Sequence, residues 1–87
     1  MAQQNGKEYR QVTGFTYKIT KEIAKLGGYG DESKELNMIS YKGRPPKYDL
    51  RVWSYADGER QMLRGITLSR EEAVLLRDAL NRELEGA

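Results

Sequence analysis

One change of sequence period divides this chain of 87 residues into two parts. Up to Leu68, apolar and polar residues alternate in several segments, which is the period of a β-strand with one buried face. From Ser69 onward, apolar residues recur every three or four positions, which is the period of a helix packed on one side. Ser69 and Glu72 form an SxxE capping box, so the helix is predicted to begin there. The sequence therefore predicts an α+β fold, with strands first and one C-terminal helix.

Four segments before Ser69 carry strand signals, and clusters of glycine or proline separate them. An Asp-Gly pair before the last segment favours a tight turn, so the last two strands should be antiparallel. Gly65 is a candidate β-bulge in the last strand. Part of the first segment also fits a helix. The expected strands of this four-stranded antiparallel sheet are residues 15–26, 34–43, 47–55 and 60–68.

The third of these segments has two different faces. Its even-numbered positions are apolar, and we predict that they face the core. Its odd-numbered positions combine charges with aromatic rings, and a buried face would not carry three charges, so we predict that this face is solvent-exposed. The alternative is that Trp53 is a core residue in a sheet covered on both faces. The two sets are Tyr48, Leu50 and Val52 for the core, and Lys47, Asp49, Arg51, Trp53 and Tyr55 for the exposed face.

The length allows one small domain, expected at residues 14–85, and the polar residues 1–13 are predicted to be a flexible tail. The predicted helix has a wide apolar surface, and a chain this short has little core of its own, so we predict a homodimer. No segment has the length and apolarity of a membrane span or a signal peptide. The sequence therefore predicts no membrane association and a cytoplasmic protein.

Residue types exclude most catalytic chemistry. The chain has no cysteine and no histidine, which removes thiol nucleophiles and the commonest metal ligands and general bases. Asp49 could be a catalytic carboxylate, but an ion pair with Arg51, two residues further along the same face, is favoured. We therefore expect no enzyme, no catalytic residue, no metal, no cofactor and no small-molecule substrate.

Exposed aromatic rings beside cations are typical of proteins that bind single-stranded nucleic acid, because rings stack on bases and cations pair with phosphates. Most of the 15 basic residues lie before Ser69, in the predicted sheet. Tyr41 and Trp53 are the candidate stacking residues. The candidate phosphate-binding residues are Lys42, Arg44, Lys47 and Arg51, with Lys18 and Arg64 on neighbouring strands.

Three ordered segments, KELNMISYKG at 34–43, PKYDLRVW at 46–53 and RGITLSREE at 64–72, resemble the YdbC-like bacterial branch of the transcriptional positive cofactor four family. These proteins bind single-stranded DNA. The resemblance implies a curved four-stranded antiparallel sheet followed by one helix, assembled as a homodimer. By the family pattern, an aromatic residue after the serine of the second strand stacks on bases, which here is Tyr41, followed by Lys42. The other positions that match the pattern are Arg51, Trp53 and Arg64.

The sequence and the resemblance together predict a single-stranded DNA-binding protein of low sequence specificity, associated with the nucleoid and acting in transcription, replication or repair. Two alternatives stay open. The first is an RNA-binding protein of the same fold, because stacking tolerates any base. The second is a dimeric protein-interaction module, because Tyr, Trp and Arg are also common interface anchors.

Overall fold

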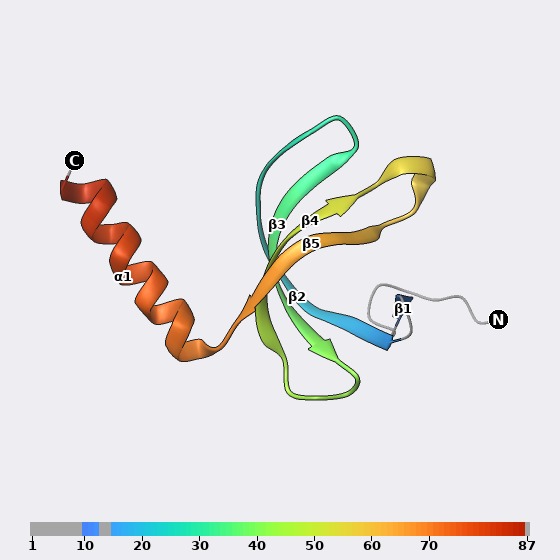
Figure 1. The fold of residues 1–87 in the computed structure, drawn as a ribbon, viewed down its shortest axis with the longest axis horizontal. Helices are drawn as coiled ribbons and strands as arrows, with labels where there is room; N and C mark the ends of the chain where they lie inside the picture. Colours follow the sequence, from blue (N-terminus) through green and yellow to red (C-terminus); the bar gives the residue numbers. More distant parts are fainter. Residues whose placement is uncertain (1–9, 13–14, 87) are drawn as a thin grey trace.

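The computed structural model describes residues 10–12 and 15–86, and it contains one five-stranded antiparallel sheet followed by one helix (Figure 1). The strands lie in the sheet in chain order, β1-β2-β3-β4-β5. The four predicted strands and the C-terminal helix are confirmed, and β1 is an additional short strand. The elements are β1 (Arg10–Val12), β2 (Phe15–Tyr29), β3 (Glu32–Tyr41), β4 (Lys47–Ser54), the short 3₁₀ helix η1 (Ala56–Gly58), β5 (Gln61–Leu68) and α1 (Arg70–Gly86).

The predicted tail is described only in part. Residues 1–9 and 13 lie outside the described residues, whereas Arg10–Val12 pair with the start of β2. The segment that also fitted a helix is strand throughout, because β2 pairs with β3 up to its end at Tyr29.

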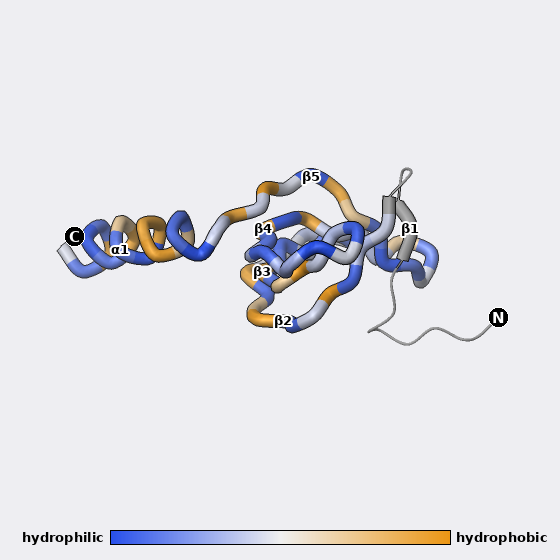
Figure 2. Tube along the Cα trace, turned by 90° about the horizontal axis from the view of Figure 1, so that it is seen from below, coloured by the Kyte–Doolittle hydropathy of each residue, from blue (hydrophilic) through white to orange (hydrophobic). Residues whose placement is uncertain are grey.

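The sheet is strongly curved, and the pairing of β2 with β3 gives the reason. The register shifts three times along this pair, between Ile19 and Lys21, between Glu22 and Ala24, and between Lys25 and Gly27. At each shift β2 contains one residue more than β3, and such bulges bend a strand and increase its twist. Figure 2 shows the strands in sheet order, with β3 and β4 between β2 and β5.

A further irregularity lies in β5, next to the predicted bulge position. Arg51 pairs with Gly65 and Trp53 pairs with Met62, so two residues of β5 lie opposite Val52 alone. A Cβ atom at Gly65 would lie 2.6 Å from the Cβ atom of Arg51, so the close approach of the two strands requires glycine there.

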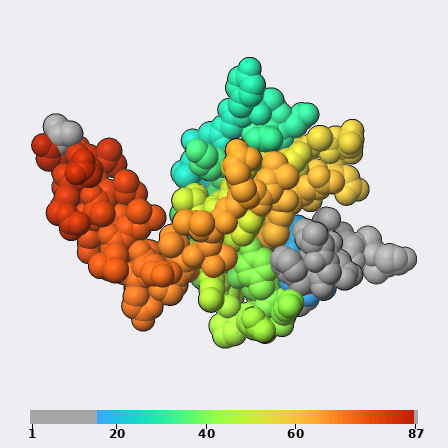
Figure 3. All heavy atoms as spheres, viewed as in Figure 1, coloured from blue at the N-terminus to red at the C-terminus, as the bar shows by residue number. Residues whose placement is uncertain are grey.

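The helix begins at the predicted capping box. The Ser69 backbone N–H donates to the Glu72 carboxylate at 2.9 Å, and the Glu72 backbone N–H donates to the Ser69 hydroxyl at 3.0 Å. From there α1 runs away from the sheet, and its contacts with the strands are made mainly with β4 and β5 (Figures 1 and 3).

The core lies on the face of the sheet that was predicted to be exposed. We call this the inner face, and its buried residues on the two central strands are Glu35, Asn37, Ile39, Asp49 and Trp53. Trp53 and Asp49 are both 0% exposed, so the prediction that the odd-numbered positions of β4 form a solvent-exposed face is wrong for these two residues. The even-numbered positions are only half-buried, so they are not the main core of the chain.

The curvature explains this reversal. Because the sheet bends, Tyr17 of β2 reaches Trp53 of β4 across the intervening strand, with ring centroids 5.8 Å apart. Of the three charges, Asp49 and Arg51 form an ion pair with each other and Lys47 stays exposed at the start of β4, so the argument that three charges exclude burial does not apply. We call the opposite side the outer face, with Leu36, Tyr48 and Leu50 on the central strands.

Candidate nucleic-acid interface

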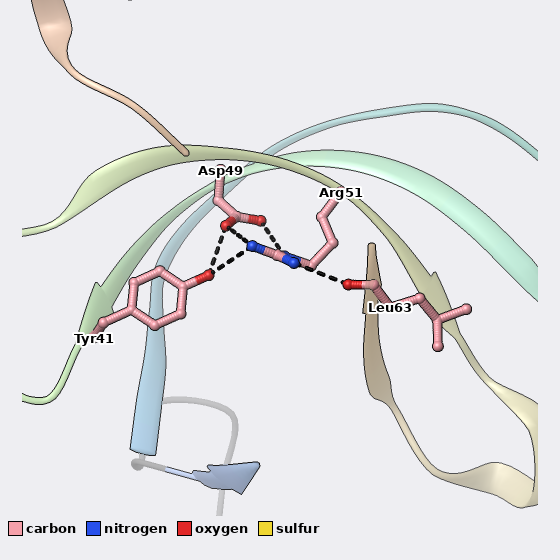
Figure 4. Close-up of polar contacts among 4 residues, drawn as sticks. All are labelled: Tyr41, Asp49, Arg51 and Leu63. Atoms are coloured by element: carbon pink, nitrogen blue, oxygen red, sulfur yellow. Dashed lines mark hydrogen bonds and ion pairs between the residues drawn. The ribbon is translucent and has the colours of Figure 1, made fainter. Parts of the chain in front are cut away.

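Three side chains of the inner face form a polar network at one end of the sheet (Figure 4). The Tyr41 hydroxyl donates a hydrogen bond to Asp49 Oδ2 at 2.6 Å. Arg51 donates from Nε to Asp49 Oδ1 at 2.9 Å and from Nη2 to Asp49 Oδ2 at 2.7 Å, which is the two-point geometry of a strong ion pair. The same Nη2 donates to the Tyr41 hydroxyl oxygen at 3.1 Å, and Nη1 donates to the Leu63 carbonyl oxygen at 2.9 Å. The predicted pairing of Asp49 with Arg51 is confirmed.

This network changes the ionisation of its members. Burial and the hydrogen bond to Asp49 both raise the pKa of Tyr41 far above its ordinary value, so the hydroxyl stays protonated. Burial by itself would lower the pKa of Arg51, but its hydrogen bonds and its charge interaction with Asp49 outweigh burial and raise that pKa. At neutral pH Tyr41 is therefore a fixed donor and Arg51 a fixed cation.

A second cluster covers Trp53 and is built around a buried carboxylate. Glu35 accepts hydrogen bonds from Arg60 Nη2 and from the Tyr55 hydroxyl, both at 2.7 Å. The Arg60 guanidinium carbon lies 4.5 Å from the centroid of the Trp53 ring, which is a cation–π contact. Burial and the hydrogen bond to Glu35 raise the pKa of Tyr55 to about 12. These contacts cover the Trp53 ring on the inner face.

The turn after β3 brings exposed cations next to Tyr41. Lys42 adopts a left-handed backbone conformation with φ of 55°, and its N–H donates to the Thr16 carbonyl oxygen at 3.0 Å. The Arg44 N–H donates to the Tyr41 carbonyl oxygen at 2.9 Å, which closes the turn. Lys47 begins β4 on the other side of the turn. The structure therefore places three predicted phosphate-binding residues, all exposed, in or beside the turn that follows Tyr41.

The other predicted site residues do not gather at this place. Trp53 is buried, so in this structure it offers no ring face to a base. Arg64 is exposed but lies on the outer face, beside Val52 and Lys34 in a groove of about 470 Å³. Lys18 is half-buried on β2, opposite Ser40. The structure thus brings Tyr41, Arg51 and the cations of the turn together and leaves Arg64 on the opposite side of the sheet.

Sequence reasoning missed the contributions of Glu35, Tyr55 and Arg60. Glu35 shares strand parity with Asn37 and Ile39, so its place on the inner face could be predicted once that face was known to be buried. Arg60 follows η1 in an irregular connection, and no periodicity predicts where such a side chain points. The acceptor role of the Leu63 carbonyl also leaves no signal in the sequence.

The family model described as Transcriptional Coactivator p15 (PC4) matches residues 30–79, more than half of the chain. The chain belongs to the PC4 family. An uncharacterized protein of Treponema pallidum (strain Nichols) is 46% identical over 68 residues, which cover 77% of this chain and 78% of that protein.

The PC4 family is a family of nucleic-acid-binding proteins, which fits the aromatic and basic surface around Tyr41. The matched region contains seven of the eight candidate residues, and only Lys18 precedes it. The predicted family is thus confirmed, while the YdbC-like branch stays a prediction.

Across residues 10–12 and 15–86, no helix is long and apolar enough to cross a membrane. Within the same described ranges, no three acidic side chains come together in a group that could hold a metal ion.

Proposed function

We propose that this protein binds single-stranded DNA with little sequence preference at the end of the sheet formed by Tyr41 and the turn that follows it. The observation that carries the proposal is the position of Tyr41. Tyr41 is half-buried, its hydroxyl is held by two hydrogen bonds, and exposed cations lie in and beside the turn that follows it in the chain. A fixed aromatic ring among cations suits a strand whose bases are unpaired, because it can stack on a base while the cations contact phosphates.

The expected strength of the interaction follows from these groups. Stacking of one base on an aromatic ring contributes about 1–3 kcal/mol. Each phosphate contact adds about 0.7 to the slope of log Kd against log salt for a single strand. Lys42, Arg44 and Lys47 together should therefore give a slope of about 2, with a further contribution if Arg64 contacts the same strand from the outer face.

We further propose that the protein is a homodimer formed through α1. Leu75 and Leu84 are 68% and 74% exposed, and apolar positions recur along the helix (Figure 2). A groove of about 500 Å³ lies between α1 and the outer face, lined by Leu36, Tyr48 and Leu68 from the sheet side. Figure 3 shows α1 standing clear of the strands. A second copy offers a matching apolar helix, so pairing of two copies would remove both surfaces from water.

The proposed setting is the bacterial nucleoid in the cytoplasm, with a role in transcription, replication or repair, as expected for the YdbC-like branch. The support for this setting is membership of the PC4 family together with the proposed ligand.

The test is a salt titration of affinity with matched ligands. A labelled single-stranded DNA oligomer, the RNA oligomer of the same sequence and the DNA duplex of the same length are titrated at several salt concentrations. The proposal expects single-stranded DNA to bind most tightly, with affinity falling as salt rises. Tighter binding of the RNA would reassign the ligand. Absence of salt-dependent binding to all three would contradict nucleic-acid binding and favour a protein partner.

A further inference from the structure

Arg51 is poorly placed to act as a phosphate contact, although the sequence predicted that role for it. A guanidinium group has five N–H donors. Arg51 uses four hydrogen bonds within the chain, two to Asp49, one to Tyr41 and one to the Leu63 carbonyl oxygen. Its side chain is only 13% exposed. Little of the group is therefore left to meet a phosphate.

The charge of Arg51 is also compensated locally. Asp49 is 0% exposed, and its two carboxylate oxygens both accept hydrogen bonds from Arg51. A buried pair of opposite charges at 2.7 Å has almost no net charge when seen from outside. Such a pair displaces few counterions when a nucleic acid binds, because counterion release follows the net positive charge brought to the phosphates.

The pair does act on Tyr41. Asp49 accepts the proton of the Tyr41 hydroxyl at 2.6 Å, and Arg51 donates to the oxygen of the same hydroxyl at 3.1 Å. With both the donor and the acceptor function of the hydroxyl engaged, the ring is held in one orientation at the end of β3 (Figure 4). An aromatic ring fixed before the ligand arrives loses less conformational entropy on binding.

We propose that Asp49 and Arg51 are positioning residues that hold the Tyr41 ring ready for a base, and that Arg51 does not contact phosphate. The inference rests on the proposed function, because it assigns roles within the same single-strand site.

The experiment compares two substitutions at Arg51 with the same two substitutions at Arg44. Arg51→Lys keeps the positive charge but cannot reproduce the two-point bond to Asp49, and Arg51→Gln removes the charge. Arg44 is exposed in the turn, so Arg44→Lys and Arg44→Gln are the matched controls. Each variant is titrated with a single-stranded oligothymidylate and with an abasic oligomer of equal length, at several salt concentrations and well below its melting temperature.

If Asp49 and Arg51 position the Tyr41 ring, the Arg51 variants should differ from the Arg44 variants in affinity and in salt slope. Arg51→Lys and Arg51→Gln should both bind oligothymidylate about tenfold more weakly, within the range for loss of one stacked base, with unchanged salt slopes. Arg51→Lys, which keeps the charge balance with Asp49, should bind the abasic oligomer as the wild type does. Arg44→Gln should instead lower the slope by about 0.7 and weaken both ligands equally, while Arg44→Lys stays near the wild type.

The opposite pattern overturns the inference. If Arg51→Lys binds like the wild type while Arg51→Gln loses about 0.7 of slope, Arg51 is a phosphate contact. If the Arg51 variants lose stability but bind both ligands normally, the network is structural only. If they fail to fold, Tyr41→Phe keeps the ring without its hydroxyl, and unchanged affinity for oligothymidylate would then contradict positioning. Failure of the wild type to bind oligothymidylate would instead refute the proposed function.

Discussion

Replacement of Trp53 by alanine tests whether the inner face is the core of the chain. Trp53 is 0% exposed, its ring lies 5.8 Å from that of Tyr17, and the Arg60 guanidinium covers it at 4.5 Å. Trp53→Ala removes all these contacts and opens a cavity between β2 and β4. We expect a large loss of the free energy of unfolding.

The magnitude follows from the buried surface. A buried aromatic side chain removes about 150–250 Å² from water, which at about 25 cal/mol per Å² corresponds to about 4–6 kcal/mol. Trp53 Nε1 has no hydrogen-bond partner in the described part of the chain. Removing this donor relieves a desolvation cost of about 1–3 kcal/mol, which brings the net loss to about 3 kcal/mol. Trp53→Phe, which keeps an aromatic ring and removes the indole N–H, should cost clearly less.

The assay is urea denaturation followed by far-ultraviolet circular dichroism, because the substitution removes the only tryptophan. Wild type and variants are compared at one protein concentration, since the stability of a dimer depends on concentration. Leu50→Ala, on the half-buried outer face, is the comparison. A loss below about 1 kcal/mol for Trp53→Ala would refute the assignment of the core to the inner face.

Three further predictions concern the cap, the tyrosines and the helix. Ser69→Ala should lower the free energy of unfolding by about 1 kcal/mol and leave single-strand affinity unchanged, because the cap is outside the proposed site; calorimetry and a binding titration check both. The pKa values of Tyr41 and Tyr55 are raised in the folded state, the latter to about 12, so their contribution to stability is present below pH 10 and lost as pH rises from about 10 toward 12. Urea denaturation at pH 8 and pH 11 measures this loss, which Tyr55→Phe should reduce; equal stability at both pH values would contradict it. Leu84→Glu should convert a dimer into a folded monomer in sedimentation experiments, and a monomeric wild type would contradict the proposed helix pairing.

Local patterns predicted the elements of the fold well. The capping box at Ser69 forms with both of its hydrogen bonds, and the Asp-Gly pair lies in the turn between β4 and β5. The family resemblance, carried by three segments, also indicated the right family. The capping box and the turn each depend on residues that are close together in the sequence, so they can be recognised before the fold is known.

The choice of the buried face could not be predicted in the same way. Strand parity grouped Asp49, Arg51 and Trp53 correctly on one face of the sheet. Which of the two faces becomes buried, however, depends on the bulges of β2 and on Arg60, which reaches Glu35 from an irregular connection. The sequence shows no sign of the three extra residues in β2 before the register with β3 is known. For the same reason, it could not show that Arg64 lies on the other side of the sheet from Tyr41.

The central claim is that the Tyr41 ring stacks on a base of a single strand. The most direct measurement is fluorescence anisotropy of a labelled single-stranded oligothymidylate titrated with wild type and with Tyr41→Ala, beside a duplex of the same length. We expect the wild type to bind the single strand more tightly than the duplex, and Tyr41→Ala to lose about tenfold in single-strand affinity with no change for the duplex. Equal binding of both ligands by the wild type, or single-strand binding by Tyr41→Ala as tight as that of the wild type, would contradict the claim.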